Sequence, residues 1–157
     1  MDDGSRGLKN RPLWICPDCG ARLASRNLWH SCGAFTFDDL FAGSTETVRD
    51  TARALISACE QFGDIQVLPQ KTRLVLVARV RFSSIVPRKK SLIVGFALHR
   101  WIDHPRIERT EDFGPRWRYH YLRISDASGV DTQLLGWMRE SYEVVGQREE
   151  LPGQQPS

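Results

Sequence analysis

The sequence contains no long hydrophobic run. None of its apolar stretches approaches the roughly 20 residues that a membrane-spanning helix needs. The first ten residues, Met1 to Asn10, are polar and contain glycine, unlike the start of a secretory signal. We therefore expect a cytoplasmic protein without a membrane partner.

Several catalytic and nucleotide-binding patterns are also missing. The chain has no P-loop, no glycine-rich dinucleotide fingerprint, no Gly-x-Ser-x-Gly and no His-Glu-x-x-His. Candidates for proton transfer are His99, Asp103, His104 and His120, but no nucleophile or pair of carboxylates is matched to them. His120 shares a strand face with apolar residues, where a satisfied core histidine is expected. An enzyme acting on a small anionic substrate stays an unsupported alternative.

Cysteine is scarce, and its distribution argues against disulfides. Three of the four cysteines cluster at positions 16, 19 and 32, and Cys59 stands apart. Without an export signal, we expect reduced thiols or thiolates. Cys59 falls on the apolar stripe of a helix predicted over 45–62, so we interpret it as a small core residue.

Four residues near the amino terminus have the spacing of metal ligands: Cys16, Cys19, His30 and Cys32. In Cys-Pro-Asp-Cys-Gly at 16–20, two thiolates can hold one tetrahedral ion, and Gly20 can take the positive φ that a tight turn needs. Four protein ligands close the coordination shell. The pattern predicts one structural zinc ion and not a catalytic one; a reduced cysteine pair with an incidental histidine is the alternative.

Positive charge is concentrated in one part of the chain. The net charge is +3, but residues 71–123 contain thirteen lysines and arginines and four acidic residues, which leaves a local net charge of +9. Such a segment favours an anionic partner such as DNA or RNA. A solvated sheet face with arginines kept for solubility is equally compatible with it.

Aromatic and cationic residues alternate over 116–123, Arg-Trp-Arg-Tyr-His-Tyr-Leu-Arg. This combination suits bases stacked on rings with phosphates held by arginine. The candidate binding residues are Arg118, Tyr119, His120, Tyr121 and Arg123, extended by Arg79, Arg81, Arg88, Lys89 and Lys90 if the strands are neighbours. The face shared by residues 117, 119 and 121 can equally belong to the core.

Periodicity predicts an α+β fold, with helices packed on one antiparallel sheet of about four or five strands. Helical segments are expected at a turn capped by Thr36, over 45–62, and from Asp131 to Gly146. The expected strands are 65–68, 72–82, 91–99, 106–110 and 116–125, with a turn at 87–90 between the second and third. The expected division is a disordered tail (1–12), a zinc knuckle (13–35), an α+β domain (36–146) and a second disordered tail (147–157).

Several of these features occur in a characteristic order. The knuckle at 14–20 is followed by His30-Ser31-Cys32, by Phe41-Ala42-Gly43 before a helix, and by a strand segment from Lys71 to Arg88. The chain thereby resembles the bacterial domain-of-unknown-function family 5655 over about residues 13–145, and its knuckle resembles a shortened zinc finger. The resemblance implies a small α+β domain. Relatives occur behind nuclease-like or DNA-associated modules, which implies a link to nucleic acid but no activity.

The sequence therefore indicates a zinc-containing binding protein. We expect its basic, aromatic sheet surface to bind nucleic acid or another polyanion. The alternative is a protein-interaction adaptor, in which zinc and sheet are scaffold and a loop such as 87–90 selects the partner.

Overall fold

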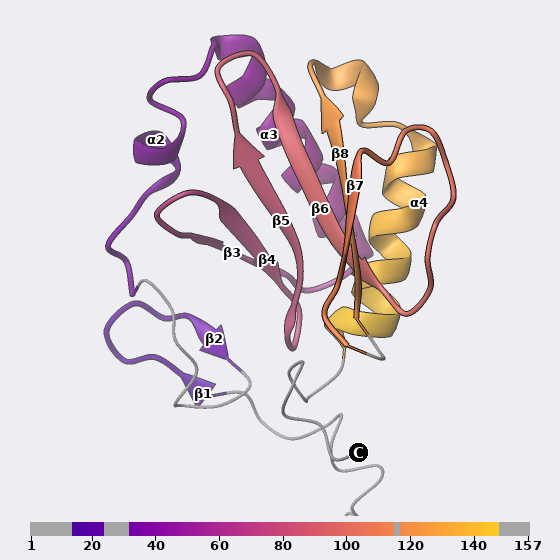
Figure 1. Ribbon diagram of the computed structural model, residues 1–157. Helices are drawn as coiled ribbons and strands as arrows, with labels where there is room; N and C mark the ends of the chain where they lie inside the picture. Colours follow the sequence, from indigo (N-terminus) through magenta and orange to yellow (C-terminus); the bar gives the residue numbers. More distant parts are fainter. Residues whose placement is uncertain (1–13, 24–31, 115–116, 148–157) are drawn as a thin grey trace, which may run out of the picture.

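The computed structural model describes residues 14–23, 32–114 and 117–147 of the chain. A small hairpin pairs β1 (Trp14–Ile15) with β2 (Arg22–Leu23). A larger sheet of six strands has the order β3-β4-β5-β6-β8-β7 (Figure 1). Except for Gln147, the two predicted tails lie outside the described residues.

Every neighbouring pair in the larger sheet is antiparallel. Its strands are β3 (Gln66–Pro69), β4 (Leu74–Val77), β5 (Arg81–Pro87), β6 (Leu92–Leu98), β7 (Arg109–Asp112) and β8 (Arg118–Ile124). The predicted α+β class with an antiparallel sheet is confirmed. The number of strands is six, above the four or five expected.

The extra strand arises from a bend inside the segment predicted as one strand over 72–82. Residues 78–80 reverse the chain, and the amides of Arg79 and Val80 both donate to the carbonyl of Gly146, at 2.7 and 2.9 Å. Strands β4 and β5 are therefore neighbours, with a register shift at Leu76/Val77. The single long strand was wrong because the group that stabilises the bend lies far along the chain.

Helix α3 (Glu46–Cys59) forms where the apolar stripe predicted it. Thr45 caps it by accepting a hydrogen bond from the amide of Val48 at 3.3 Å, and its buried side chains include Leu55 and Cys59. The helix continues as a 3₁₀ turn (Glu60–Phe62). Cys59 is fully buried, as expected of a core residue.

Two further α-helices are shorter than α3, and a 3₁₀ turn (Ala127–Gly129) precedes the second of them. Helix α2 (Phe37–Leu40) begins at the predicted Thr36 cap, where Thr36 and Asp39 form a capping box. Helix α4 (Thr132–Ser141) is capped by Asp131 and runs into a π-helical turn (Tyr142–Gly146). None of the described helices is long and apolar enough to cross a bilayer.

Helices α3 and α4 lie on the same face of the larger sheet (Figure 1). The main core fills the space between them and includes Phe82, Phe96, Leu122 and Leu134, all fully buried. Burial of each such side chain contributes about 1.5–3 kcal/mol. The core thus occupies one face of the sheet, and side chains on the other face point away from the helices.

Candidate functional site

Three cysteines converge beside the β1–β2 hairpin. The sulfur atoms of Cys16, Cys19 and Cys32 all lie within 4.8 Å of one another, and those of Cys16 and Cys32 are 3.7 Å apart. In a tetrahedral site with Zn–S bonds of about 2.3 Å, neighbouring sulfurs are about 3.8 Å apart, whereas a disulfide bond is about 2 Å long. The three thiols could therefore hold a metal ion.

Tight backbone turns bring these thiols together. The amide of Gly20 donates to the carbonyl of Cys16 at 2.8 Å, and Gly20 has the positive φ, 78°, that the sequence predicted. Cys32 and Gly33 are consecutive left-handed residues with φ of 53° and 78°. A non-glycine residue in this region costs about 1 kcal/mol, and such strain is concentrated at functional positions.

Proximity also disfavours the charged form of the thiols. The hydrogen bond with Cys16, followed by desolvation and the neighbouring Cys19, raises the pKa of Cys32 to about 12. Thiolates this close repel one another unless a cation lies between them. The cluster is therefore suited to thiolates only together with a positive ion.

His30, the fourth predicted ligand, lies outside the described residues. Of the four predicted ligands, the structure therefore describes the three cysteines. Cys59 is separate from them in the core, where burial raises its pKa to about 12.

The hairpin docks on the edge strand β3 through Gln66. The Gln66 Oε1 atom accepts a hydrogen bond from the Arg22 amide at 2.6 Å, and its Nε2 donates to the Gly20 carbonyl at 3.1 Å. The Arg22 guanidinium pairs with Asp64, and its hydrogen bond lowers the pKa of that carboxyl. These contacts fix the thiol cluster to one edge of the larger sheet.

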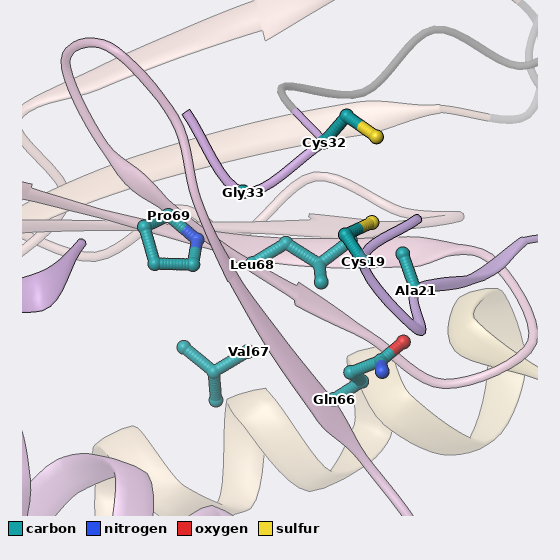
Figure 2. Close-up of a pocket in the computed structure, with 8 residues that line it drawn as sticks. All are labelled: Cys19, Ala21, Cys32, Gly33, Gln66, Val67, Leu68 and Pro69. Atoms are coloured by element: carbon teal, nitrogen blue, oxygen red, sulfur yellow. The ribbon is translucent and has the colours of Figure 1, made fainter. Parts of the chain in front are cut away.

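A pocket of about 190 Å³ lies at this junction. Its lining residues are Cys19, Ala21, Cys32, Gly33, Gln66, Val67, Leu68 and Pro69 (Figure 2). The volume is below the range of about 300–1,000 Å³ typical of small-molecule sites. We interpret the pocket as the seam between the hairpin and β3.

The second candidate site is the face of the larger sheet opposite α3 and α4. Alternation along β8 places Tyr119, Tyr121 and Arg123 on this face and His120 toward the helices. His120 is fully buried, stacks on Phe96 at 5.5 Å, and its Nε2 accepts a hydrogen bond from the Ile102 amide at 3.0 Å. Burial lowers the pKa of His120. This histidine is therefore a core residue, separated from the tyrosines on the opposite face of the sheet.

Tyr119 and Tyr121 lie over Gly95 of β6. A Cβ atom at position 95 would be 2.6 Å from Tyr119 Cε2 and 3.1 Å from Tyr121 Cδ1. The two ring centroids are 5.1 Å apart. The Tyr119 hydroxyl donates to Ser84 Oγ at 3.0 Å, and the Tyr121 hydroxyl donates to Glu111 at 2.5 Å. The absence of a side chain at Gly95 lets both rings rest on the sheet.

Charged and aromatic groups border the tyrosine pair. The Arg109 guanidinium lies 4.0 Å from the Tyr121 ring centroid, and Phe113, which is 50% exposed, lies 5.9 Å from the Tyr119 ring. Burial, followed by the hydrogen bond to Glu111, raises the pKa of Tyr121 to about 12. Tyr121 therefore stays neutral at physiological pH and adds no negative charge to this face.

The predicted basic residues separate into two groups around this pair. Arg123 donates to Ser91 Oγ at 3.0 Å, beside the exposed β5–β6 turn that carries Arg88, Lys89 and Lys90. The strand register puts this turn at the opposite end of β8 from Tyr119. Arg123 therefore links the tyrosine pair to the basic turn.

The other predicted arginines lie at the Tyr119 end of the sheet. Arg81 is half-buried, and burial lowers its pKa. The neighbouring Tyr119 offsets part of this effect. Arg79 is half-buried in the 78–80 bend. Arg118 contacts Asp112 and the Gly114 carbonyl and lies over the Trp101 ring at 5.3 Å, so it is not part of the tyrosine face.

The family model described as Domain of unknown function (DUF5655) matches residues 37–145. The chain belongs to this family. The DUF5655 match begins at α2 and ends in the π-helical turn, so it covers the larger sheet and its helices. The thiol cluster at 16, 19 and 32 precedes the DUF5655 match, whereas the tyrosine face lies inside it. No curated protein and no solved structure matches the chain.

Four residues of these two sites were missed from the sequence: Gln66, Gly95, Arg109 and Phe113. Gly95 carried a usable signal, because a glycine inside a strand pattern often marks the close approach of another group. The other three carried no such signal. Their roles depend on which strands become neighbours in the sheet.

Proposed function

We propose that this protein binds nucleic acid or another polyanion through the face of its larger sheet opposite α3 and α4. One observation carries the proposal: Tyr119 and Tyr121 lie side by side on that face, bordered by Arg109 and Arg123. Rings beside guanidinium groups combine stacking surfaces with positive charge, which is how nucleic-acid-binding sheets hold bases and phosphates.

The charges on this face can turn toward an anionic ligand at little cost. Arg109 pairs with Glu111 at 3.3 Å and Arg123 with Glu108 at 3.4 Å, and all four side chains are substantially exposed. Exposed ion pairs of this kind contribute only about 0–1 kcal/mol. Phosphates can therefore compete with the glutamates for Arg109 and Arg123. The nearby turn with Arg88, Lys89 and Lys90 extends the positive surface.

The proposal assigns the thiol cluster a structural role, as a zinc site formed by Cys16, Cys19, Cys32 and His30. The tetrahedral spacing of Cys16 and Cys32 supports zinc. The cluster docks on β3, at the edge of the sheet opposite the β7–β8 edge. This role requires thiols that stay reduced, so the proposal includes a reducing compartment such as the cytoplasm.

The test measures fluorescence anisotropy of labelled single- and double-stranded DNA and RNA at about 50 and 200 mM salt. We expect binding that weakens as salt rises, because bound phosphates release counterions. The double variant Lys89→Gln/Arg123→Gln should bind more weakly. The double variant Arg53→Gln/Arg139→Gln removes the same charge from α3 and α4 on the other face and should bind like the wild type.

Absence of binding at low salt would refute the proposal and favour the protein-interaction adaptor. Equal losses in the two double variants would show that net charge, and not this face, governs binding.

A further inference from the structure

We infer that the ligand of this face is single-stranded nucleic acid, whose bases stack on a row of planar groups along β7 and β8. The inference rests on the proposed function and specifies its ligand. The row consists of Phe113, Tyr119, Tyr121 and Arg109, and we refer to it as the ring row.

The ring row is continuous. The centroids of Phe113 and Tyr119 are 5.9 Å apart, those of Tyr119 and Tyr121 are 5.1 Å apart, and the Arg109 guanidinium lies 4.0 Å from the Tyr121 ring. Unpaired bases stack on aromatic rings and on guanidinium planes alike. Every member of the row is therefore planar, and the exposed members can serve as platforms for bases.

The exposed fractions of the four side chains show which members of the ring row a base can reach. Phe113 is 50% exposed and the Arg109 side chain is 59% exposed, whereas Tyr121 is only 7% exposed. Arg109 covers the Tyr121 ring, and Tyr119 is half-buried between its neighbours. The accessible stacking surfaces are thus Phe113 and Arg109, and the tyrosines support them from the sheet.

The row leads to phosphate-binding groups. Strand β8 rises about 3.3 Å per residue, so Tyr119 and Arg123 are about 13 Å apart along the strand. Stacked bases follow one another at about 3.4 Å along a nucleic-acid strand, so this length accommodates about four nucleotides. Beyond Arg123, the turn with Lys89 and Lys90 can hold the backbone that continues past the row.

The described helices offer few side chains that could contact the bases of a duplex. A recognition helix needs basic or amide side chains free to reach base edges in the major groove. In α3, Arg49 donates to the Phe41 carbonyl at 3.1 Å, and Arg53 lies over the Phe37 ring at 4.8 Å. In α4, Arg139 pairs with Glu143 at 3.4 Å. Arg49 and Arg53 are thus held against the protein itself, and α4 offers Arg139 alone as a basic residue.

The deciding experiment compares three probes of equal length by fluorescence anisotropy with the full-length protein. They are oligothymidylate of about 15 nucleotides, an abasic oligonucleotide of the same length, and a duplex of the same length. All three present phosphates, but only the first presents unpaired bases. We expect oligothymidylate to bind at least about tenfold more tightly than the other two, since each stacked base contributes severalfold to affinity.

Substitutions at Phe113 then test whether bases stack on this ring. Phe113→Leu keeps an apolar group but removes the ring, and we expect a loss of about fivefold or more for oligothymidylate alone. Phe113→Tyr should restore binding. Val144→Ala, a matched change at another exposed apolar residue, should have no effect.

The possible outcomes separate the inference from the function on which it rests. Equal binding of all three probes would overturn single-strand stacking and leave polyanion binding intact. Tighter binding of the duplex, or loss of oligothymidylate binding that Phe113→Tyr does not restore, would also overturn the inference. Absence of binding by every probe would overturn both.

Discussion

Tyr119 rests on Gly95, because a Cβ atom at position 95 would lie only 2.6 Å from Tyr119 Cε2 and 2.8 Å from Ser84 Oγ. Gly95→Ala should therefore push the Tyr119 ring off β6 and break its hydrogen bond to Ser84. We expect a loss of about 1–3 kcal/mol in the free energy of unfolding, typical of overpacking. Chemical denaturation measures it.

Gly136→Ala is the matched control. Gly136 lies within α4, and a Cβ atom there would meet nothing within 4 Å. The same substitution should raise the free energy of unfolding by about 0.5–1 kcal/mol, because alanine favours a helix interior. If the two variants were equally stable, the packing of Tyr119 on Gly95 would not constrain this position.

Metal content tests the thiol cluster. We expect about one zinc ion per chain in the purified protein, since one cluster with zinc-like spacing is present among the described residues. Cys32→Ser and His30→Asn should lower the zinc content, measured by elemental analysis, and reduce thermal stability. Cys59→Ala removes a core thiol and should keep the ion. A folded wild type without metal would contradict the assignment.

Docking of the β1–β2 hairpin should depend on Gln66. Gln66→Ala removes the hydrogen bonds to Arg22 and Gly20, each contributing about 1 kcal/mol. We expect faster hydrogen exchange in residues 14–23 with zinc content unchanged. Gln61→Ala, an exposed glutamine in the 3₁₀ turn, should leave exchange in the hairpin unaltered. Unchanged exchange in Gln66→Ala would show that other contacts hold the hairpin.

His120 should make stability depend on pH. Burial lowers its pKa in the folded state, and protonation would turn the Nε2 acceptor toward Ile102 into a donor facing another donor. A lowered folded pKa contributes stability above the unfolded value of about 6.5, and this contribution is lost as pH falls through the folded pKa. The free energy of unfolding should therefore fall from pH 7.5 to about pH 5.5.

His120→Phe should flatten this pH dependence, although it also costs stability by leaving the Ile102 amide without its acceptor. An unchanged slope in His120→Phe would assign the titration to another group.

Local signals account for much of the fold. The Thr36 capping box, the apolar stripe of α3 and the Asp131 cap of α4 each depend on residues within a few positions, so the sequence predicts them directly. The Gly20 turn is another such feature, because its glycine follows the second cysteine of the motif.

Long-range contacts explain what the sequence could not predict. The bend at 78–80 contains neither glycine nor proline and depends on the carbonyl of Gly146. Arg109 reaches Tyr121 only because β7 pairs with β8, and Gln66 reaches the hairpin only because β3 is an edge strand. These positions become functional candidates through strand order, which no local pattern encodes.

The central claim is that the tyrosine face of the sheet contacts nucleic acid. Photocrosslinking of single-stranded DNA containing a halogenated uracil, followed by mass spectrometry of the linked peptides, tests it most directly. We expect crosslinks at Phe113 or Tyr119, the more exposed rings of that face. Crosslinks confined to Trp101 or Trp137, whose rings lie against His120 and His104 on the helix side, would contradict the account.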